Sequence, residues 1–435
     1  MTSNSKPGLK KTAALVLVIA FCGVCAWSVF HVKYRGKTAP LTSDRAAPDD
    51  GDNSLTKEQQ DRIRQLQAIG YLAGTNPAPK KTGVTVYKKG LTFDGTNLYV
   101  SGHFPEATLI DMEGDVLHTW RKGFEDVWPD RTVPEKGDGL HWDHYWRRAH
   151  LYENGDLLAI YEGLGLIKVD KDSNLLWEFS GPAHHDLDVL ENGDIYVLTR
   201  VARMIPRINS EKPVLEDFVT ILDANGRVKR QVSMLEAFEK SEFAYVLDQK
   251  MPREGDLFHS NTLERFDGSL GHLSPIFKRG NILTSCKLLD TIAIIDMDTE
   301  TVVWCRTGPW SFQHQPTLLK NGNMLIFDNN THGDHSRVLE FEPLTGTIVW
   351  SYTGSPPTSF YTHSSGSCQL LPNGNILISE TDDGRAFEVT RDRTIVWKFV
   401  NPHRADDSNE RIAVLPELVR LNPEFPLDWI AAGSS

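Results

Sequence analysis

The chain has 435 residues, of which 40% are hydrophobic and 24% charged, so it holds enough apolar material for a large folded core. Its formal net charge is −12, and it has no long run of Lys or Arg. A nucleic-acid partner is therefore not expected, because neutralising phosphates requires a basic surface. Five cysteines, two of them in an apolar segment near the N-terminus, exclude a disulfide-built scaffold.

An uncharged run over residues 13–30 lies close to the N-terminus and is flanked on both sides by basic residues. A helix of this length spans roughly 27 Å, close to the thickness of a bilayer's hydrocarbon core. The run predicts an uncleaved signal anchor, a transmembrane helix within residues 1–37. We expect it to hold the rest of the chain on the periplasmic or extracellular side of a membrane. A cleaved signal peptide is the alternative, although no clear A-x-A cleavage site follows.

Residues 38–82 are predicted to form a linker that contains one short amphipathic helix. Thr56 and Gln59 have the spacing of a capping box. Apolar side chains then recur on one helical face, at Ile63, Leu66 and Ile69. The helix is expected to pack on the main domain, with no chemistry implied.

The rest of the chain repeats a strand–turn–strand motif. Its clearest copies are HHDLDVLENGDIYVLTR from His184, QHQPTLLKNGNMLIFDN from Gln313 and GSCQLLPNGNILISET from Gly366. Asn-Gly between apolar runs predicts a two-residue type I′ hairpin, in which both turn residues have positive φ. A second hairpin usually follows and ends in Trp, at Trp120, Trp177, Trp304, Trp350 and Trp397.

Six such units predict an all-β fold, a six-bladed β-propeller over residues 83–402 with a C-terminal tail at 403–435. The units start near Leu91, Arg147, His185, His259, His314 and Ser367. A β-sandwich or two stacked β-domains are the alternatives, and six copies of one motif argue against both. Either residues 83–87 or the tail after Asn401 could join the last blade to the first.

Three histidines occupy corresponding places at the start of predicted first strands. His185 and His314 each lie seven residues before the Asn of their turn, and His259 opens the strand in DLFHSNTLERF. Because the first strand of each blade lines the central channel, these imidazoles should gather at one mouth of it, where ligand sites are expected. A lone histidine at a strand start is usually a loop hydrogen-bonder, but three in equivalent positions favour a functional site.

These motifs resemble the arylsulfotransferase family, PAPS-independent six-bladed propellers that move a sulfuryl group between phenols. The D-x-x-H-x-N and Q-H-x-P-x-x-L-x-N-G pieces are the most specific, and the resemblance spans about residues 83–402. It implies that His314 becomes sulfated and that His259, Asn261 and His185 belong to the site. Where the family has Arg in a Ser-Ser-Arg run, NILTSCKLL places Lys287, which keeps the charge but loses the bidentate fork.

The resemblance implies an aryl sulfate donor, a phenol acceptor and a ping-pong reaction without a cofactor. His314 would attack sulfur, while Lys287, His259 and Asn261 donate to the sulfuryl oxygens and His185 or His259 acts as acid and base. The chain has no G-x-x-x-x-G-K-[ST] loop. Two alternatives remain: a membrane-anchored, non-catalytic ligand-binding propeller, and a metal-dependent hydrolase or lactonase that uses the rim histidines.

Overall fold

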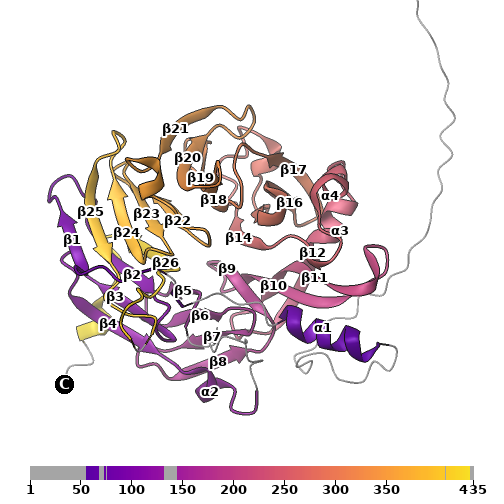
Figure 1. The fold of residues 1–435 in the computed structure, drawn as a ribbon, viewed down its shortest axis with the longest axis horizontal. Coiled ribbons are helices and arrows are strands. Elements are labelled where there is room, and N and C mark those ends of the chain that lie inside the picture. The colour runs from indigo at the N-terminus through magenta and orange to yellow at the C-terminus, as the bar shows by residue number, and fades with distance from the viewer. Residues whose placement is uncertain (1–54, 68–72, 75, 132–144, 407, 432–435) are drawn as a thin grey trace, which may run out of the picture. The chain divides into compact units, whose positions relative to one another are not determined.

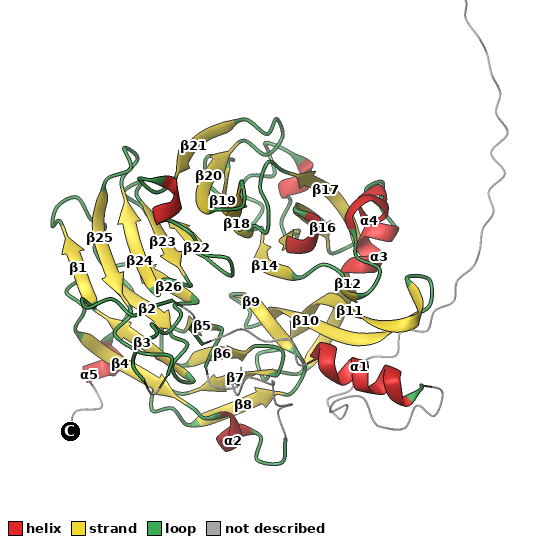
Figure 2. Cartoon of the chain, viewed as in Figure 1, coloured by secondary structure: helices red, strands yellow, loops and turns green. Residues whose placement is uncertain are grey.

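Six antiparallel sheets follow one another around a ring, which is the six-bladed β-propeller predicted from the repeat (Figure 1). The structure is a computed structural model that describes residues 55–67, 73–74, 76–131, 145–406 and 408–431. These residues belong to one compact unit. Strands and loops dominate it, with a few short helices (Figure 2). The all-β assignment is confirmed for this part of the chain.

Each sheet forms one blade, whose four strands are ordered here from the centre of the ring outward. Blade 1 comprises β26 (Glu417–Leu421), β2 (Thr96–Val100), β3 (Glu106–Ile110) and β4 (Val116–Arg121). Blade 2 comprises β5 (Arg148–Leu151), β6 (Leu157–Tyr161), β7 (Gly165–Val169) and β8 (Leu175–Phe179). Blade 3 comprises β9 (Ala183–Val189), β10 (Ile195–Ile205), β11 (Asn209–Leu222) and β12 (Val228–Ser233). Blade 4 comprises β14 (Ser260–Arg265), β15 (Ile282–Cys286), β16 (Thr291–Asp296) and β17 (Thr301–Thr307). Blade 5 comprises β18 (His314–Leu318), β19 (Met324–Thr331), β20 (His335–Phe341) and β21 (Ile348–Tyr352). Blade 6 comprises β22 (Ser367–Leu370), β23 (Ile376–Glu380), β24 (Arg385–Val389) and β25 (Ile395–Val400). A short extra strand in blade 3, β13 (Gly255–Asp256), pairs in parallel with β11.

The ring is closed by strands from both ends of the domain. β26, near the C-terminus, pairs antiparallel with β2 and supplies the innermost strand of blade 1. β1 (Gly83–Tyr87) pairs antiparallel with β25 and adds a fifth, outermost strand to blade 6. The propeller therefore continues to Leu421, past residue 402, where we expected the tail to begin. β26 has no hairpin partner adjacent in sequence, so the repeat could not reveal it.

Arg420 of β26 fastens this closure. Its guanidinium is fully buried and lies 3.0 Å from a carboxylate oxygen of Glu388 in blade 6. The Nε atom donates to Oδ1 of Asn97 in β2 at 2.5 Å, and the guanidinium carbon lies 4.8 Å from the ring centroid of Trp397. One side chain thus joins the first blade to the last.

The hairpin turns differ from the predicted type I′ geometry. Gly193 has a φ of 83°, but Asn192 is not among the residues with positive φ. The Gly193 N–H donates to the carbonyl of Leu190 at 2.9 Å, and the Asn192 side chain accepts the N–H of Asp194 at 3.0 Å. The turn is therefore longer than two residues and contains one glycine with positive φ. The Asn192 side chain accepts a backbone N–H, so Asn192 itself does not need positive φ.

The repeated tryptophans lie on outer strands, as predicted: Trp120 in β4, Trp177 in β8, Trp304 in β17, Trp350 in β21 and Trp397 in β25. The Trp120 indole N–H donates to the carbonyl of Gly155, in a hairpin of blade 2, at 3.0 Å. Trp397 donates in the same way to Met112 of blade 1 at 2.9 Å. These two indoles fasten their blade to a hairpin of the neighbouring blade. The buried indole N–H of Trp177 has no hydrogen-bond partner among the described residues.

The predicted amphipathic helix is present as α1 (Lys57–Gln67). Thr56 and Gln59 form the capping box, with N–H to side-chain bonds of 2.9 and 3.1 Å. Ile63 and Leu66 are buried against β10 and β11 of blade 3. The other α-helices are α2 (Phe124–Val127), α3 (Met234–Glu239), α4 (Tyr245–Lys250) and α5 (Asp428–Ala431).

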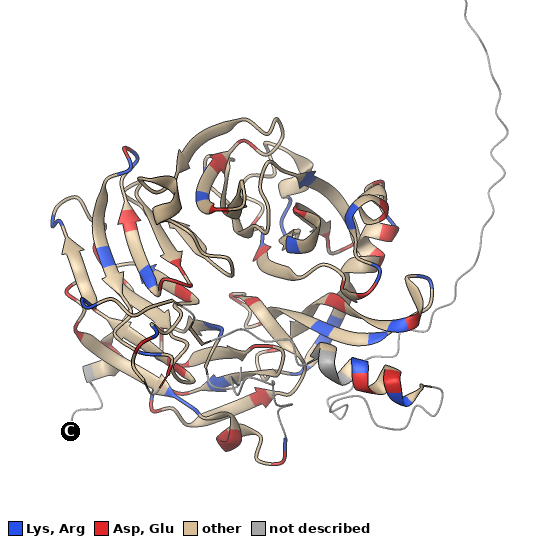
Figure 3. Cartoon of the chain, in the orientation of Figure 1, with Lys and Arg blue, Asp and Glu red and all other residues tan. Residues whose placement is uncertain are grey.

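The predicted anchor over residues 13–30 lies outside the described residues. Among the helices that are described, none has both the length and the apolar character needed to cross a bilayer. Basic and acidic residues are interspersed along the strands and loops of the described blades (Figure 3). The ion pairs Lys229–Asp194 and Lys89–Glu113, each 2.7 Å, are examples of this mixing at the surface.

Candidate functional site

The three predicted histidines lie at the start of the innermost strands of blades 3, 4 and 5. His185 lies in β9, His259 directly precedes β14, and His314 is the first residue of β18. In each strand the pairing with the second strand shifts register at this point. His185 and His259 also have positive φ, 52° and 50°. Bulges and left-handed residues of this kind re-aim side chains and are frequent at functional sites.

The tautomer of His314 is fixed by its surroundings. Its Nδ1 lies 3.0 Å from the carbonyl oxygen of Phe312 and 2.8 Å from Oδ1 of Asn329. Both neighbours are acceptors, so Nδ1 carries the proton and Nε2 carries the lone pair. The Asn329 amide cannot present its nitrogen to the ring, because Nδ2 donates to the carbonyls of Thr362 and Ser365 at 3.0 and 2.7 Å.

The other nitrogen of His314 is poised for chemistry. Nε2 is buried and has no hydrogen-bond partner among the described residues. Burial, followed by the charge of Lys287, holds the pKa of His314 well below its usual range. The imidazole therefore stays neutral and nucleophilic at neutral pH.

His259 is paired with a carboxylate. Its Nδ1 donates to Oδ2 of Asp256 at 2.7 Å, and its backbone N–H donates to Oδ1 of the same residue at 2.9 Å. Burial, together with the charges of Lys287 and Arg200, lowers the pKa of His259 against the opposing effect of Asp256. Burial would raise the pKa of Asp256, but the charge and hydrogen bonds of His259, together with the charge of Arg200, lower that pKa to about 2. An imidazole held by an ionised Asp is suited to accept and return a proton.

His185 is the most enclosed of the three. Its ring centroid lies 5.0 Å from that of His259, in an edge-on arrangement. Its Nδ1 lies 2.8 Å from Nδ1 of His184 and 3.3 Å from Oε1 of Glu162. Burial and the neighbouring histidine His259 hold its pKa well below the ordinary value. The structure thus brings His185 and His259 into direct contact.

Lys287 lies at the start of a 3-10 turn after β15 and is 9% exposed. Its Nζ lies 5.6 Å from the ring centroid of Phe312. Burial lowers the pKa of Lys287, and Asp256 opposes that shift. Lys287 makes no ion pair with any described residue, and its charge contributes to the lowered pKa values of His259 and His314.

Phe312 is strained for an aromatic residue, with a φ of 55°. The side chain of Asp290 holds this conformation by accepting the Phe312 N–H at 3.2 Å. The exposed His363 lies beside it, with ring centroids 6.4 Å apart. The Phe312 ring therefore lies between a buried cation and the outer rim of the site.

Asn261 faces the protein backbone. Its Nδ2 donates to the carbonyl of Gln313 at 2.9 Å, and its Oδ1 accepts the hydroxyl of Thr262 at 3.2 Å. Because Gln313 directly precedes His314, the contact positions the predicted nucleophile. Three members of this arrangement were missed in the sequence analysis: Asp256, Asn329 and Phe312. Asp256 alone had a signal, as the first residue of D-x-x-H-x-N.

The histidines of blades 3 to 5 do not form a metal-ligand set. The described residues hold two groups with suitable spacing, Glu162 with His184 and His185, and His103 with Glu106 and His403. In the first group, Nη2 of Arg200 lies 3.4 Å from Oε1 of Glu162, and a guanidinium disfavours a second cation there.

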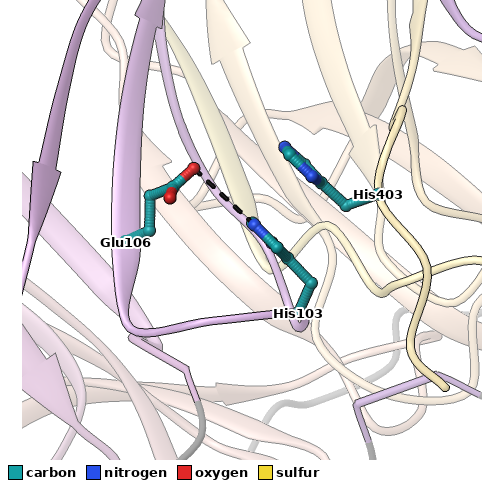
Figure 4. Close-up of side chains that lie close together, drawn as sticks. All are labelled: His103, Glu106 and His403. Atoms are coloured by element: carbon teal, nitrogen blue, oxygen red, sulfur yellow. Dashed lines mark ion pairs between the residues drawn. The ribbon is translucent and has the colours of Figure 1, made fainter. Parts of the chain in front are cut away.

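The second group lies where the segment after β25 meets blade 1 (Figure 4). The rings of His103 and His403 are stacked with centroids 3.5 Å apart and planes only 4° apart. Nε2 of His103 lies 3.7 Å from Oε1 of Glu106. The nitrogen lone pair of an imidazole lies in the plane of its ring. Two parallel, stacked rings therefore cannot both direct a lone pair at one ion. This group is a contact of the ring closure.

A family model described as arylsulfotransferase (ASST) matches residues 148–402, from blade 2 through blade 6. No curated protein matches the sequence. Among solved structures, a protein of unknown function from Bacteroides caccae is 13% identical, with 75% of this chain and 98% of that chain covered and a TM-score of 0.46. A streptogramin B lyase is 12% identical, with 78% and 97% covered and a TM-score of 0.41. Structural likenesses this weak carry no argument about function.

Proposed function

The chain belongs to the arylsulfotransferase family, and we propose that it moves a sulfuryl group from an aryl sulfate to a phenol through a sulfo-histidine at His314. The observation that carries this proposal is the tautomer of His314. Its Nδ1 proton is held by two acceptors, and its Nε2 lone pair has no partner in the described part of the chain. A neutral, oriented imidazole is the nucleophile that such a transfer requires.

In the first half-reaction, Nε2 of His314 attacks the sulfur of the aryl sulfate. The N–S bond forms as the S–O bond to the ring breaks, and the phenolate leaves with the electron pair. Positioning is expected to supply most of the rate, since the transition state of such a transfer is loose and has little covalent chemistry to assist. The bond from Asn261 to Gln313 supports that positioning.

In the second half-reaction, a phenol takes the sulfuryl group from His314. His259 removes the phenol proton as the oxygen attacks sulfur, and the N–S electron pair returns to Nε2. The carboxylate of Asp256, 2.7 Å from Nδ1, stabilises the imidazolium formed on His259. His259 then gives this proton to the phenolate that leaves in the next turnover. His185 packs against His259 and holds its ring in place.

Two side chains would contact the substrate, one at its charged sulfuryl group and the other at its aromatic ring. Lys287 faces the site without an ion-pair partner among the described residues and would bind sulfuryl oxygens. Phe312, on the rim side of Lys287, offers a face on which a phenol ring would stack. Both groups favour an aromatic, singly charged substrate.

We also propose that residues 13–30 anchor the propeller to a membrane, on its non-cytoplasmic side. The uncharged run and its basic flanks support this. The full chain should stay in the membrane fraction after alkaline carbonate washing. Recovery of a soluble chain with a new N-terminus beyond Ser28 would show a cleaved signal peptide.

The reaction is tested by rapid mixing of the protein with a chromogenic aryl sulfate, followed by mass spectrometry. A burst of phenol should match the amount of protein, and His314 should gain about 80 Da, the mass of SO₃. His314→Asn should lose both burst and adduct, whereas His272→Asn, which changes an exposed histidine, should keep both. A burst that persists in His314→Asn would rule out the covalent route. No burst from the native chain with several aryl sulfates would favour a ligand-binding propeller.

A further inference from the structure

We propose that Arg147 is a second anion-binding residue of this site and holds a sulfuryl oxygen together with Lys287. The inference rests on the proposed function and names a residue that the repeat marks only as the start of the second blade and that the family motifs do not contain. Inside the propeller, Arg147 and Lys287 are buried cations that form no ion pair with any described residue.

Arg147 is buried and has no side-chain partner among the described residues. It is 6% exposed, its Nε is completely buried, and neither a hydrogen bond nor an ion pair joins its side chain to any described residue. The next residue provides the contrast, because Arg148 lies 2.9 Å from Asp186 and 3.1 Å from Glu417. A buried guanidinium normally has such partners, since an uncompensated charge in the interior is costly. Arg147 is therefore a buried donor without an acceptor in the part of the chain that the structure describes.

The position of Arg147 is that of a site residue. It directly precedes β5, the innermost strand of blade 2, as His259 directly precedes β14 in blade 4. Its backbone N–H donates to the carbonyl of Ile160 in β6 at 2.8 Å, which fixes the residue at the end of the strand pair. Its charge also contributes to the lowered pKa values of His185, His314 and Lys287. Arg147 therefore acts electrostatically on side chains of blades 3, 4 and 5.

The carboxylates near these cations already have partners. Asp256 is bound to His259, and Glu162 lies beside Arg200 and His185. Asp256 and Asp382 act on Lys287 at a distance, but neither Arg147 nor Lys287 forms an ion pair with a described carboxylate. A counter-charge in direct contact with these two cations is therefore missing among the described residues. A sulfate ester supplies that charge, and its oxygens match the planar fork of a guanidinium. Arg147 thereby supplies a planar guanidinium that can donate two hydrogen bonds to one sulfuryl group. The family's Arg has this geometry and Lys287 lacks it.

Inorganic sulfate is the probe that tests this proposal. The melting temperature of the native chain should rise with sulfate and saturate, relative to chloride at equal ionic strength. Arg147→Met should lose this rise, and Arg147→Lys should need several-fold more sulfate for the same rise. Arg253→Met, which removes an exposed guanidinium, should respond as the native chain does. Without sulfate, Arg147→Met should melt no lower than the native chain, because it replaces an unpaired charge with an apolar side chain.

An unchanged sulfate response in Arg147→Met would overturn the proposal. So would a marked loss of stability of that variant without sulfate, which would make Arg147 a structural residue. If Arg147→Met does not fold, a native-like response of Arg147→Lys would be decisive against the proposal. An Arg147-dependent sulfate response without any phenol burst would reject sulfuryl transfer yet support the anion site, so the two failures are distinguishable.

Discussion

The side-chain amide of Asn261 in blade 4 donates to the backbone carbonyl of Gln313 in blade 5 at 2.9 Å. Gln313 directly precedes His314, so the geometry of the proposed nucleophile depends on the neighbouring blade. We had expected Asn261 to donate to the substrate's sulfuryl oxygens. Its 3% exposure and its backbone partner fit a positioning role.

Asn261→Ala is therefore expected to slow the chemical step without weakening anion binding. The Gln313 carbonyl keeps the Ser285 hydroxyl as a donor at 3.1 Å, so the lost hydrogen bond should cost only about 0.5–1.5 kcal/mol of stability. Burst kinetics should show a lower rate at saturating aryl sulfate, with an unchanged sulfate-induced rise in melting temperature. A weakened sulfate response would indicate that Asn261 contacts the anion directly.

Lys287 is expected to be essential as a charge and replaceable by Arg. Lys287→Ala should lower the burst rate by about 10²–10³, as expected for one preorganised donor to an oxyanion. Lys287→Arg should keep the rate or raise it. Lys89→Ala, at an exposed ion pair, serves as the control and should leave the rate unchanged.

The pH profile separates these Lys287 variants further. Because burial lowers the pKa of Lys287, the native chain should lose activity on the alkaline side below pH 10.5. Lys287→Arg should remove this decline, since a guanidinium stays charged there. Superimposable alkaline profiles for the two proteins would assign the decline to another group.

The stacked pair His103 and His403 is expected to make the ring closure sensitive to acid. Burial, then the charge of His403, lowers the pKa of His103 to about 3. Between pH 6.5 and about 3 the unfolded chain binds a proton on His103 that the folded protein does not, so stability falls as pH falls through this window.

Denaturant unfolding of His103→Gln should show a flatter acid dependence than the native chain. The difference in slope should be at most about 1.4 kcal/mol per pH unit. His272→Gln, at an exposed position, is the matched control. Equal slopes for His103→Gln and the native chain would exclude His103 as the acid-sensitive group.

Arg420 is expected to be among the most important single residues for the stability of the ring. Arg420→Met leaves the buried carboxylate of Glu388 without its cation and should cost about 3–5 kcal/mol in denaturant unfolding. Arg207→Met breaks the exposed pair with Glu239 and should cost under about 1 kcal/mol. The double variant Arg420→Met with Glu388→Gln should recover part of the loss. Equal effects of the two single Arg variants would contradict this role.

The sequence predicted the parts of this molecule that repeat. Apolar periodicity and Asn-Gly turns identified six blades, and the spacing to the turn placed His185 and His314 on innermost strands. The Trp positions followed from the same period. Local pattern sufficed here, because each blade is built mainly from residues close together in the chain.

The parts that depend on contacts between blades were not predictable. Asn329 sets the tautomer of His314 through carbonyls of a loop some 33 residues later in the chain, at Thr362. Arg147 starts a repeat unit but belongs to no family motif, and its proposed role follows from the absence of a side-chain partner among the described residues. The assignment of Asn261 to the substrate likewise needed the position of Gln313, which belongs to another blade.

The pairing of β26 with β2 also sets an order of events during synthesis. Blades 2 to 5 each consist of a continuous stretch of chain and can be completed as translation proceeds. Blade 1 is translated first but lacks its innermost strand until residue 421 has left the ribosome. Until then β2 presents an unpaired edge, the kind of surface that invites pairing with another chain. A premature stop between β25 and β26 would thus leave every other strand of the six blades encoded and the ring permanently open.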